Sequence, residues 1–216
     1  MKKIYILLIV LLIVVIAVCI YLFCCNRNRT HSVTICSQVW MVKNLDVSKY
    51  RNGDDIPQVT DASTWANLTT GAWCYYENNT ANGTVYGKLY NWFAVNDPRG
   101  LAPAGWHIPS QAEWVTLQNC LGNDPGGKVK ETGTAHWKTP NTGATNSSGF
   151  TAFPAGGRSN SNGIFFGISE GTTWWTSSEL DATRAKAPFV DYNSTYLATP
   201  GYNFKTTGYS VRCIKD

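Results

Sequence analysis

The sequence has few charged side chains, and this scarcity excludes one class of partner. Asp, Glu, Lys and Arg make up 15% of the 216 residues, and the formal net charge is +4. Part of this positive charge belongs to Lys2, Lys3, Arg27 and Arg29, so the rest of the chain is close to neutral. Because a nucleic-acid-binding domain needs a basic patch or stripe to meet phosphates, we expect no nucleic-acid partner.

Residue types and motifs that carry catalysis or bind metals are also scarce. The chain has three His residues. It has no Cys-x-x-Cys motif, which argues against a structural zinc site, and no Gly-x-Ser-x-Gly nucleophile turn. His107 lies in Gly-Trp-His-Ile-Pro, directly before a predicted helix, and we expect it to be structural. These observations predict a protein that is not an enzyme.

Three acidic residues lie close together in the sequence. Asp54, Asp55 and Asp61 would form an acidic patch if the chain brought them together. Their spacing does not match a calcium-binding loop. We therefore expect no cofactor. Bound Ca²⁺ is the alternative, although the spacing of the acidic residues does not indicate it.

The N-terminal segment is the one long apolar run. Residues 4–25 contain no charge, and at about 1.5 Å per residue a helix of this length spans a bilayer core of roughly 30 Å. We therefore predict a membrane anchor at residues 1–25, a polar linker at 26–32 and a domain at 33–216. The domain would lie on the extracytoplasmic side of a bacterial membrane, crossed once. A cleaved signal peptide and a lipoprotein signal ending at Cys19 are the alternatives.

The remaining sequence is rich in aromatic residues, which can bury enough surface for a core. Aromatics make up 13% of the chain, with nine Trp and eleven Tyr. The β-branched run Val33–Met41 predicts a first strand, and Tyr209–Lys215 predicts a closing strand. Ser110 followed by Glu113 is a capping box, which predicts a helix to about Cys120. Residues 122–170 predict long ordered loops. The fold class is α+β, with about two helices and an antiparallel sheet.

Several short strings coincide with one family in order and at plausible spacing. The strings are Val39-Trp40-Met41, Tyr86-Gly87-Lys88-Leu89-Tyr90-Asn91-Trp92, Gly105-Trp106-His107-Ile108-Pro109, Gly156-Gly157-Arg158, Trp174-Trp175-Thr176-Ser177-Ser178 and Gly208-Tyr209-Ser210-Val211-Arg212-Cys213. Together they resemble the Fibrobacter succinogenes major paralogous domain family. The resemblance implies a C-type-lectin-like fold in which the first and last strands pair. It implies a surface or secreted bacterial protein, but it supplies no reaction. Cys36 departs from the family pattern, in which Gly is common at that position.

Four cysteines lie in the predicted domain, namely Cys36, Cys74, Cys120 and Cys213. An even number in an exported domain favours disulfides, with three possible pairings, and buried free thiols are the alternative. The resemblance implies Cys74–Cys213 together with Cys36–Cys120. Pairing of the first and last strands also permits Cys36–Cys213.

Two segments are candidates for ligand binding. Trp174, in a Trp-Trp strand, would serve as a stacking platform, and core packing is the alternative. A segment between the Trp strand and the closing strand is rich in Tyr, Asn, Ser and Thr, which is the composition of adaptable binding loops. A solvated polar hairpin is the alternative for it. Its candidate residues are Asp191, Tyr192, Asn193, Tyr196, Tyr202 and Asn203.

The leading functional hypothesis is a membrane-anchored binding or adhesion module on a bacterial surface, without catalytic activity. Its ligand would be a glycan or a surface protein. One alternative is a structural envelope protein without a specific ligand. The other is an enzyme related to the formylglycine-generating enzymes, whose paired active-site cysteines have no convincing counterpart in this sequence.

Overall fold

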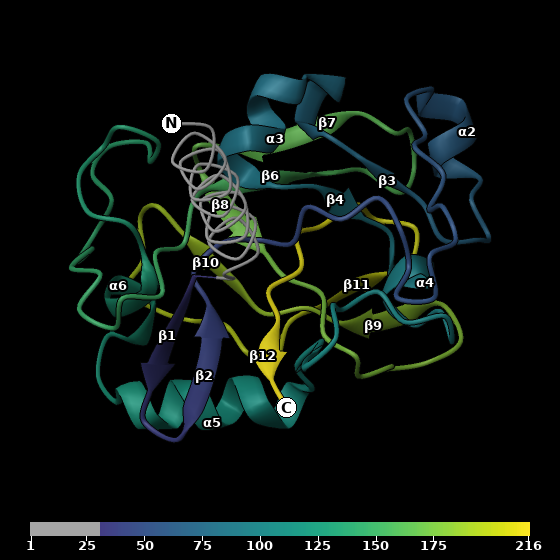
Figure 1. Cartoon of the computed structure of the whole chain (residues 1–216). Helices are drawn as coiled ribbons and strands as arrows, with labels where there is room; N and C mark the ends of the chain where they lie inside the picture. Colours follow the sequence, from purple (N-terminus) through teal and green to yellow (C-terminus); the bar gives the residue numbers. More distant parts are fainter. Residues whose placement is uncertain (1–30) are drawn as a thin grey trace, which may run out of the picture. The chain divides into compact units, whose positions relative to one another are not determined.

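The structure, a computed structural model, describes residues 31–216, in which short helices and strands follow one another along the chain (Figure 1). The helical segments are α2 (Ala62–Ala66), the 3-10 turn η1 (Tyr76–Asn78), α3 (Thr80–Tyr86), α4 (Trp92–Val95), α5 (Gln111–Leu121) and α6 (Pro125–Val129). The strands are β1 (Ser32–Ile35), β2 (Gln38–Met41), β3 (Trp73–Cys74), β4 (Leu89–Tyr90), β5 (Trp106–His107), β6 (Ala155–Arg158), β7 (Phe165–Ile168), β8 (Gly171–Thr173), β9 (Arg184–Lys186), β10 (Phe189–Asp191), β11 (Tyr202–Phe204) and β12 (Ile214–Lys215).

The two ends of the domain meet in one sheet, with the order β1-β2-β12-β5. Ile214 of β12 lies opposite Trp40 of β2 in an antiparallel pair, so the predicted pairing of first and last strands is confirmed. The single predicted strand Val33–Met41 is wrong, because the chain turns back at Cys36 and Ser37 to form the β1–β2 hairpin. Cys36 has a φ of 52°, a left-handed conformation that glycine adopts most readily. The expected Gly at this position therefore marks a tight hairpin turn.

Helix α5 packs beside this sheet and encloses a cluster of large rings. The predicted capping box is confirmed, because the Ser110 side chain accepts from the Glu113 N–H and the Glu113 carboxylate accepts from the Ser110 N–H. Trp114 on α5 is fully buried and stacks on Trp174 at 5.2 Å between ring centroids. Trp40 contributes a third ring, 4.8 Å from Trp114. We call this group, together with Phe150, the helix-side cluster.

A second cluster lies on the other side of the Trp-Trp segment. Trp175 is fully buried in it with Tyr209 and Trp92, and Trp106 packs against it from a half-buried position. The Trp-Trp segment therefore separates two cores, and both of its indole rings are buried. Trp174 belongs to the helix-side cluster, so its predicted role as an exposed stacking platform is wrong. The alternative of core packing is correct for it.

The sheet that carries the candidate site has the order β10-β8-β6-β7. Strands β10 and β8 are antiparallel, as are β6 and β7, whereas β6 and β8 run parallel. Two further pairs, β11–β9 and β3–β4, form separate two-stranded sheets. Four sheets of short strands therefore take the place of the predicted antiparallel sheet.

Buried cations hold the long loops in place. Arg212 is fully buried, and its guanidinium donates to the carbonyl oxygens of Met41 and Phe150 and to Asn44 Oδ1. Trp174 Nε1 donates to the same Asn44 oxygen at 3.0 Å. Burial lowers the pKa of Arg212 to about 9. Because a buried charge is tolerated only when its donors are satisfied, these carbonyl positions are fixed relative to one another.

Arg158 fixes backbone carbonyl positions in the segment before α2 in the same way. It is 1% exposed, and it donates to the carbonyl oxygens of Val59, Thr60 and Gly163 at 2.7–2.9 Å. Its guanidinium lies 4.6 Å from the ring of Trp65. Within residues 31–216, neither Arg158 nor Arg212 forms an ion pair with a carboxylate. In the predicted loop segment 122–170, the backbone carbonyls of Phe150 and Gly163 are therefore held by buried guanidinium groups.

The predicted fold class needs two corrections. The domain has more helices than the two expected, because segments of 4 to 7 residues such as α4 and α3 are too short to show a helical period. The second correction concerns the predicted transmembrane helix. Residues 31–216 contain no helix that is long and apolar enough to cross a bilayer. The segment 4–25, through which membrane contact was predicted, lies outside the described residues, as do residues 1–25 and most of the linker.

Candidate functional site

A hollow of about 230 Å³ opens over the sheet β10-β8-β6-β7. The β8–β10 register explains which side chains face it. Phe189 lies opposite Thr173, and Asp191 lies opposite Gly171, so these positions share one face of the sheet. The intervening pair, Val190 and Thr172, is buried at 1% and 2% exposure. The hollow is lined by Gly156, Phe166, Gly167, Glu170, Gly171, Thr172, Thr173, Phe189, Val190 and Asp191.

Glycines form the floor of the hollow because no side chain fits there. A Cβ at Gly156, which has a φ of 61°, would lie 2.4 Å from the carbonyl oxygen of Phe166. A Cβ at Gly171 would lie 2.9 Å from the carbonyl oxygen of Val190. Both distances are too short for a real Cβ, so close approach of neighbouring backbones requires glycine at these positions.

Two phenylalanine side chains border the floor and remain open to solvent. Phe166 and Phe189 are each 43% exposed. Phe166 meets the buried Tyr209 ring edge-on, with 6.3 Å between ring centroids. The Tyr209 hydroxyl accepts a hydrogen bond of 2.6 Å from Asn203. Exposed large rings within a concave surface are typical of a binding site, because burial by a ligand would remove apolar area from water.

Two carboxylates supply the polar side of the hollow. Asp191 Oδ1 accepts from the Asn193 N–H at 3.2 Å, whereas Oδ2 lies over the floor, 3.8 Å from the position of a Cβ on Gly171. Glu170 forms an exposed ion pair of 2.7 Å with Lys138. Of the described residues that line the hollow, none is Lys, Arg or His. The hollow is therefore acidic and rich in hydrogen-bond acceptors.

A buried lysine fixes the backbone behind Asp191. Lys130 is fully buried, and its ammonium donates to the carbonyl oxygens of Thr142, Asp191 and Ser194 at 2.9–3.0 Å. All three N–H donors are thus used, and desolvation lowers the pKa of Lys130 to about 8. The Gly126 N–H adds a bond of 2.8 Å to the Thr195 carbonyl. The turn after β10 is therefore attached to α6 and to the 142 loop, which gives Asp191 a fixed position.

The sequence profile of the Fibrobacter succinogenes major domain matches residues 33–215. The chain belongs to the Fibrobacter succinogenes major domain family. This confirms the resemblance drawn from the short strings. No curated protein and no solved structure matches the chain, so the C-type-lectin-like fold implied by the resemblance has no support from the comparisons.

Most of the family's short strings lie in the cores, although Gly156 of one string lines the hollow. The predicted ligand residues are only partly brought together. Asp191 lines the hollow. Tyr192 packs partly against the helix-side cluster, and the Lys138 ammonium lies 5.0 Å from its ring. Asn203 points toward Tyr209. Tyr196 and Tyr202 are 52% and 53% exposed, and neither lines the hollow. Asn193 is exposed and contributes its backbone N–H to Asp191.

The sequence prediction missed Phe166, Glu170, Thr173 and Phe189. Three of them, Phe166, Thr173 and Phe189, lie on strands of one sheet, and Glu170 lies in the turn between β7 and β8, so their proximity depends on strand register across distant segments. One sequence signal would have found part of this site: glycines occur within predicted extended segments, as the pair Gly156-Gly157 and after two large rings in Phe165-Phe166-Gly167. Glycine inside a strand indicates a close backbone approach or a site for a ligand.

The four cysteines within residues 31–216 divide into one bridge and two thiols. Cys36 and Cys120 form a disulfide that joins the β1–β2 turn to the C-terminal end of α5, so this implied pairing is confirmed. The implied Cys74–Cys213 bridge is wrong for this structure, because both are buried free thiols. They belong to different clusters, Cys74 with Trp65 and Cys213 with Trp175. Burial raises the pKa of each thiol to about 12, so neither is a ready nucleophile.

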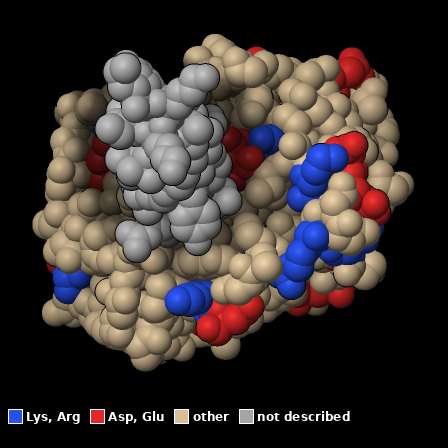
Figure 2. Space-filling view, in the orientation of Figure 1, with Lys and Arg blue, Asp and Glu red and all other residues tan. Residues whose placement is uncertain are grey.

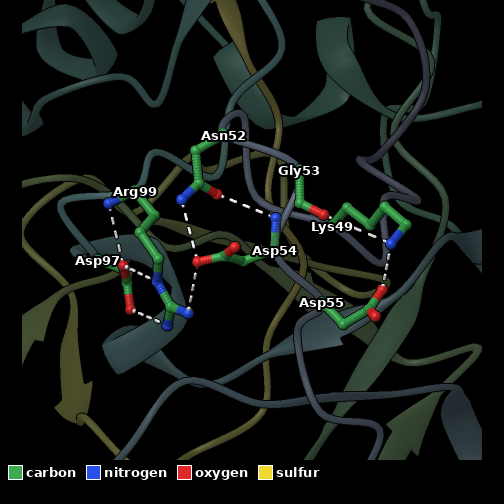
Figure 3. Close-up of polar contacts among 7 residues, drawn as sticks. All are labelled: Lys49, Asn52, Gly53, Asp54, Asp55, Asp97 and Arg99. Carbon is green, nitrogen blue, oxygen red and sulfur yellow. Dashed lines mark hydrogen bonds and ion pairs between the residues drawn. The ribbon is translucent and has the colours of Figure 1, made fainter.

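The acidic residues singled out from the sequence are already partnered. Figure 3 shows Asp54 accepting from Asn52 and Arg99, while Asp55 pairs with Lys49 at 2.5 Å. Asp61 caps α2 by accepting from the Thr64 N–H, apart from that network. No group of three or more His, Cys, Asp or Glu within residues 31–216 is arranged to hold a metal ion.

His107 lies between two carboxylates, on β5 at the edge of the sheet β1-β2-β12-β5. Its Nε2 lies 2.8 Å from Glu113, and its Nδ1 lies 2.8 Å from Asp216. Burial lowers the pKa of His107, but the hydrogen bonds to Glu113 and Asp216 outweigh it and raise the pKa above its ordinary value. Both ring nitrogens are thus engaged in joining α5 to β12. The predicted structural role of His107 agrees with this geometry.

Charges on the visible face of the molecule are interspersed. Figure 2 shows Lys and Arg atoms lying beside Asp and Glu atoms, with most of the visible surface uncharged. Among the described residues, exposed ion pairs such as Lys49–Asp55 and Lys138–Glu170 join charges of opposite sign. The visible face therefore presents no continuous basic stripe of the kind that phosphates require.

Proposed function

We propose that this family member is a non-catalytic, extracytoplasmic binding module and that its ligand is a glycan held in the hollow. The observation that carries the proposal is the pairing of two exposed phenylalanines with acceptor carboxylates on a glycine floor. A sugar ring presents apolar C–H faces and several hydroxyl donors. Phe166 and Phe189 would cover the apolar faces, and Asp191 would accept from hydroxyl groups.

The size of the hollow limits what it can enclose. Its volume of about 230 Å³ lies below the range of roughly 300–1,000 Å³ for sites that bury whole drug-sized ligands. We therefore expect the hollow to enclose one residue of a longer saccharide, with the rest of the chain outside. Pre-ordering of the site by Lys130 would favour binding, because less conformational freedom is lost.

Two further observations support the proposal without testing it. A disulfide such as that between Cys36 and Cys120 is typical of an oxidising compartment outside the cytoplasm. The raised pKa values of Cys74 and Cys213 argue against thiol chemistry like that of formylglycine-generating enzymes.

A saccharide array probed with the purified full chain tests the proposal. Phe189→Ala and Phe166→Ala should each weaken binding about tenfold or more, which corresponds to about 1.4 kcal/mol. Tyr202→Ala is the matched control, because it also removes an exposed aromatic ring but lies outside the hollow. Binding that survives Phe189→Ala and Phe166→Ala unchanged, or no binding to any saccharide, would overturn the proposal.

A protein ligand is the second candidate, and one surface favours it. In the β11–β9 ribbon, Tyr202 lies opposite Lys186 and Phe204 lies opposite Arg184. Tyr202 and Phe204 are 53% and 49% exposed, so this face presents rings beside cations. Aromatic and Arg side chains are enriched at protein interfaces. Loss of partner binding in Tyr202→Ala and Phe204→Ala, with Phe189→Ala unaffected, would favour this candidate over a glycan.

A further inference from the structure

We propose that the hollow selects a saccharide unit that carries a positively charged amino group, that is, an amino sugar whose nitrogen is not acetylated. This inference rests on the proposed function and names the ligand class of the same site. Its basis is the charge and geometry of the hollow rather than its apolar character alone.

The first observation is an imbalance of charge. Glu170 and Asp191 both line the hollow, and the described lining residues include no cation. Glu170 is paired with Lys138 at 2.7 Å, which partly neutralises it. Asp191 is paired with no Lys, Arg or His side chain within residues 31–216. The Lys130 ammonium interacts with Asp191 electrostatically, but it donates to the Asp191 backbone carbonyl at 2.9 Å and not to the carboxylate. A cationic group entering the hollow would therefore meet one carboxylate that forms no direct ion pair.

The second observation is the position of the Asp191 carboxylate. Oδ1 is engaged by the Asn193 N–H at 3.2 Å, and this bond sets the direction of the side chain. Oδ2 lies above the glycine floor, 3.8 Å from where a Cβ of Gly171 would be. Lys130 and its three carbonyl partners hold the backbone behind it. The carboxylate is thus directed into the hollow without the ligand having to reorganise it, which favours a charge-assisted hydrogen bond.

The third observation is the pair of exposed rings. The faces of aromatic rings attract cations, and this attraction is added to the apolar contact. Phe166 and Phe189, each 43% exposed, border the hollow from β7 and β10. A neutral sugar would use the rings only for apolar contact, and a free cation would use them only for charge. A protonated amino sugar uses the rings and the carboxylate together, which is why we choose this class.

Paired oligosaccharides test the inference. The probes are glucosamine oligomers linked β-1,4 and the same oligomers fully N-acetylated, at mildly acidic pH, at which the free sugar amine carries a proton. Calorimetry with the full chain should show at least about tenfold tighter binding of the free-amine oligomer. Its affinity should fall as salt is raised from about 0.01 M to about 1 M, over which the screening length shrinks from roughly 30 Å to 3 Å. The affinity of the acetylated oligomer should change little.

Asp191→Asn separates charge from shape. The amide keeps the oxygen that accepts from Asn193, so the loop should stay in place while the negative charge is lost. We expect the free-amine oligomer to bind about tenfold more weakly to this variant and the acetylated oligomer to bind within about twofold. Asp55→Asn is the matched control, because it changes the net charge equally at an exposed residue outside the hollow. It should leave both affinities unchanged.

The outcomes distinguish failure of the inference from failure of the proposed function. Equal binding of both oligomers, unaffected by Asp191→Asn, would overturn the amino-group inference and leave a glycan-binding module. Equally tight binding of an oligolysine peptide would also overturn it, since charge alone would then suffice. Binding of no saccharide on the array would refute the proposed function itself.

Discussion

Trp114→Ala tests whether the helix-side cluster holds the domain together. Trp114 is fully buried, with ring centroids of Trp40, Trp174 and Phe150 at 4.8, 5.2 and 5.8 Å. Replacing a buried Trp with Ala costs about 3–5 kcal/mol, depending on how far the neighbours collapse into the cavity. Here Trp40 and Trp174 are fixed by hydrogen bonds from their own indole N–H groups to Gln38 and Asn44. We therefore expect a cost near the upper end of that range.

The assay is thermal unfolding of the purified full chain. For a domain of roughly 150–250 residues, each kcal/mol shifts the Tm by about 2–4 °C, so Trp114→Ala should lower it by about 8–20 °C. Trp114→Phe should recover most of the loss, because Trp114 Nε1 makes no hydrogen bond within the described residues. Trp106→Ala is the control, since Trp106 is only half-buried. A Tm loss for Trp114→Ala no larger than that for Trp106→Ala would refute the reasoning.

Three further predictions concern the bridge, the buried lysine and the clamped histidine. Because the Cys36–Cys120 bridge closes a separation of 84 residues, Cys36→Ser with Cys120→Ser should destabilise the chain by about 4 kcal/mol, and an unchanged denaturation midpoint would contradict this. Lys130→Met removes the ammonium donor from three carbonyl oxygens, of which that of Asp191 keeps a long bond from the Ser194 N–H, and it should cost about 1–3 kcal/mol. Lys128→Met removes one such bond and should cost less, and equal costs would argue against the role of Lys130. Since the folded pKa of His107 is raised, its stabilisation is full below the unfolded pKa of about 6.5 and is lost as pH rises through the folded pKa. The stability difference between the native chain and His107→Gln should therefore be largest at mildly acidic pH and shrink as pH rises above about 6.5, and a difference that grows would show the sign to be wrong.

The features that sequence predicted correctly are local or family-specific. The capping box at Ser110 and Glu113 needs only four consecutive residues, so its signal does not depend on the rest of the fold. Pairing of the first and last strands came from the resemblance to the family. The hairpin turn at Cys36 was missed because Val33–Met41 is continuously suited to a strand, and only the unusual φ of Cys36 divides it.

The candidate site lay beyond sequence reasoning for a different reason. Phe166, Asp191 and Phe189 come from strands that meet only through the β10-β8-β6-β7 order, which no local pattern specifies. Trp174 and Trp175 illustrate the same difficulty. Alternation along a strand predicts one buried and one exposed ring, but both are buried because the segment passes between two cores. Composition identified Asp191 within a polar loop without showing which of its neighbours share its face.

The most direct test of the hollow is an amide NMR titration of the isotope-labelled full chain with the tightest-binding saccharide from the array. The account predicts that the largest shifts occur at Gly156, Gly167 and Gly171, whose glycine amides lie in the floor of the hollow, and at the neighbouring Thr173. These shifts should disappear in Phe189→Ala. Shifts concentrated at Tyr202–Phe204, with the floor glycines unmoved, would contradict the account.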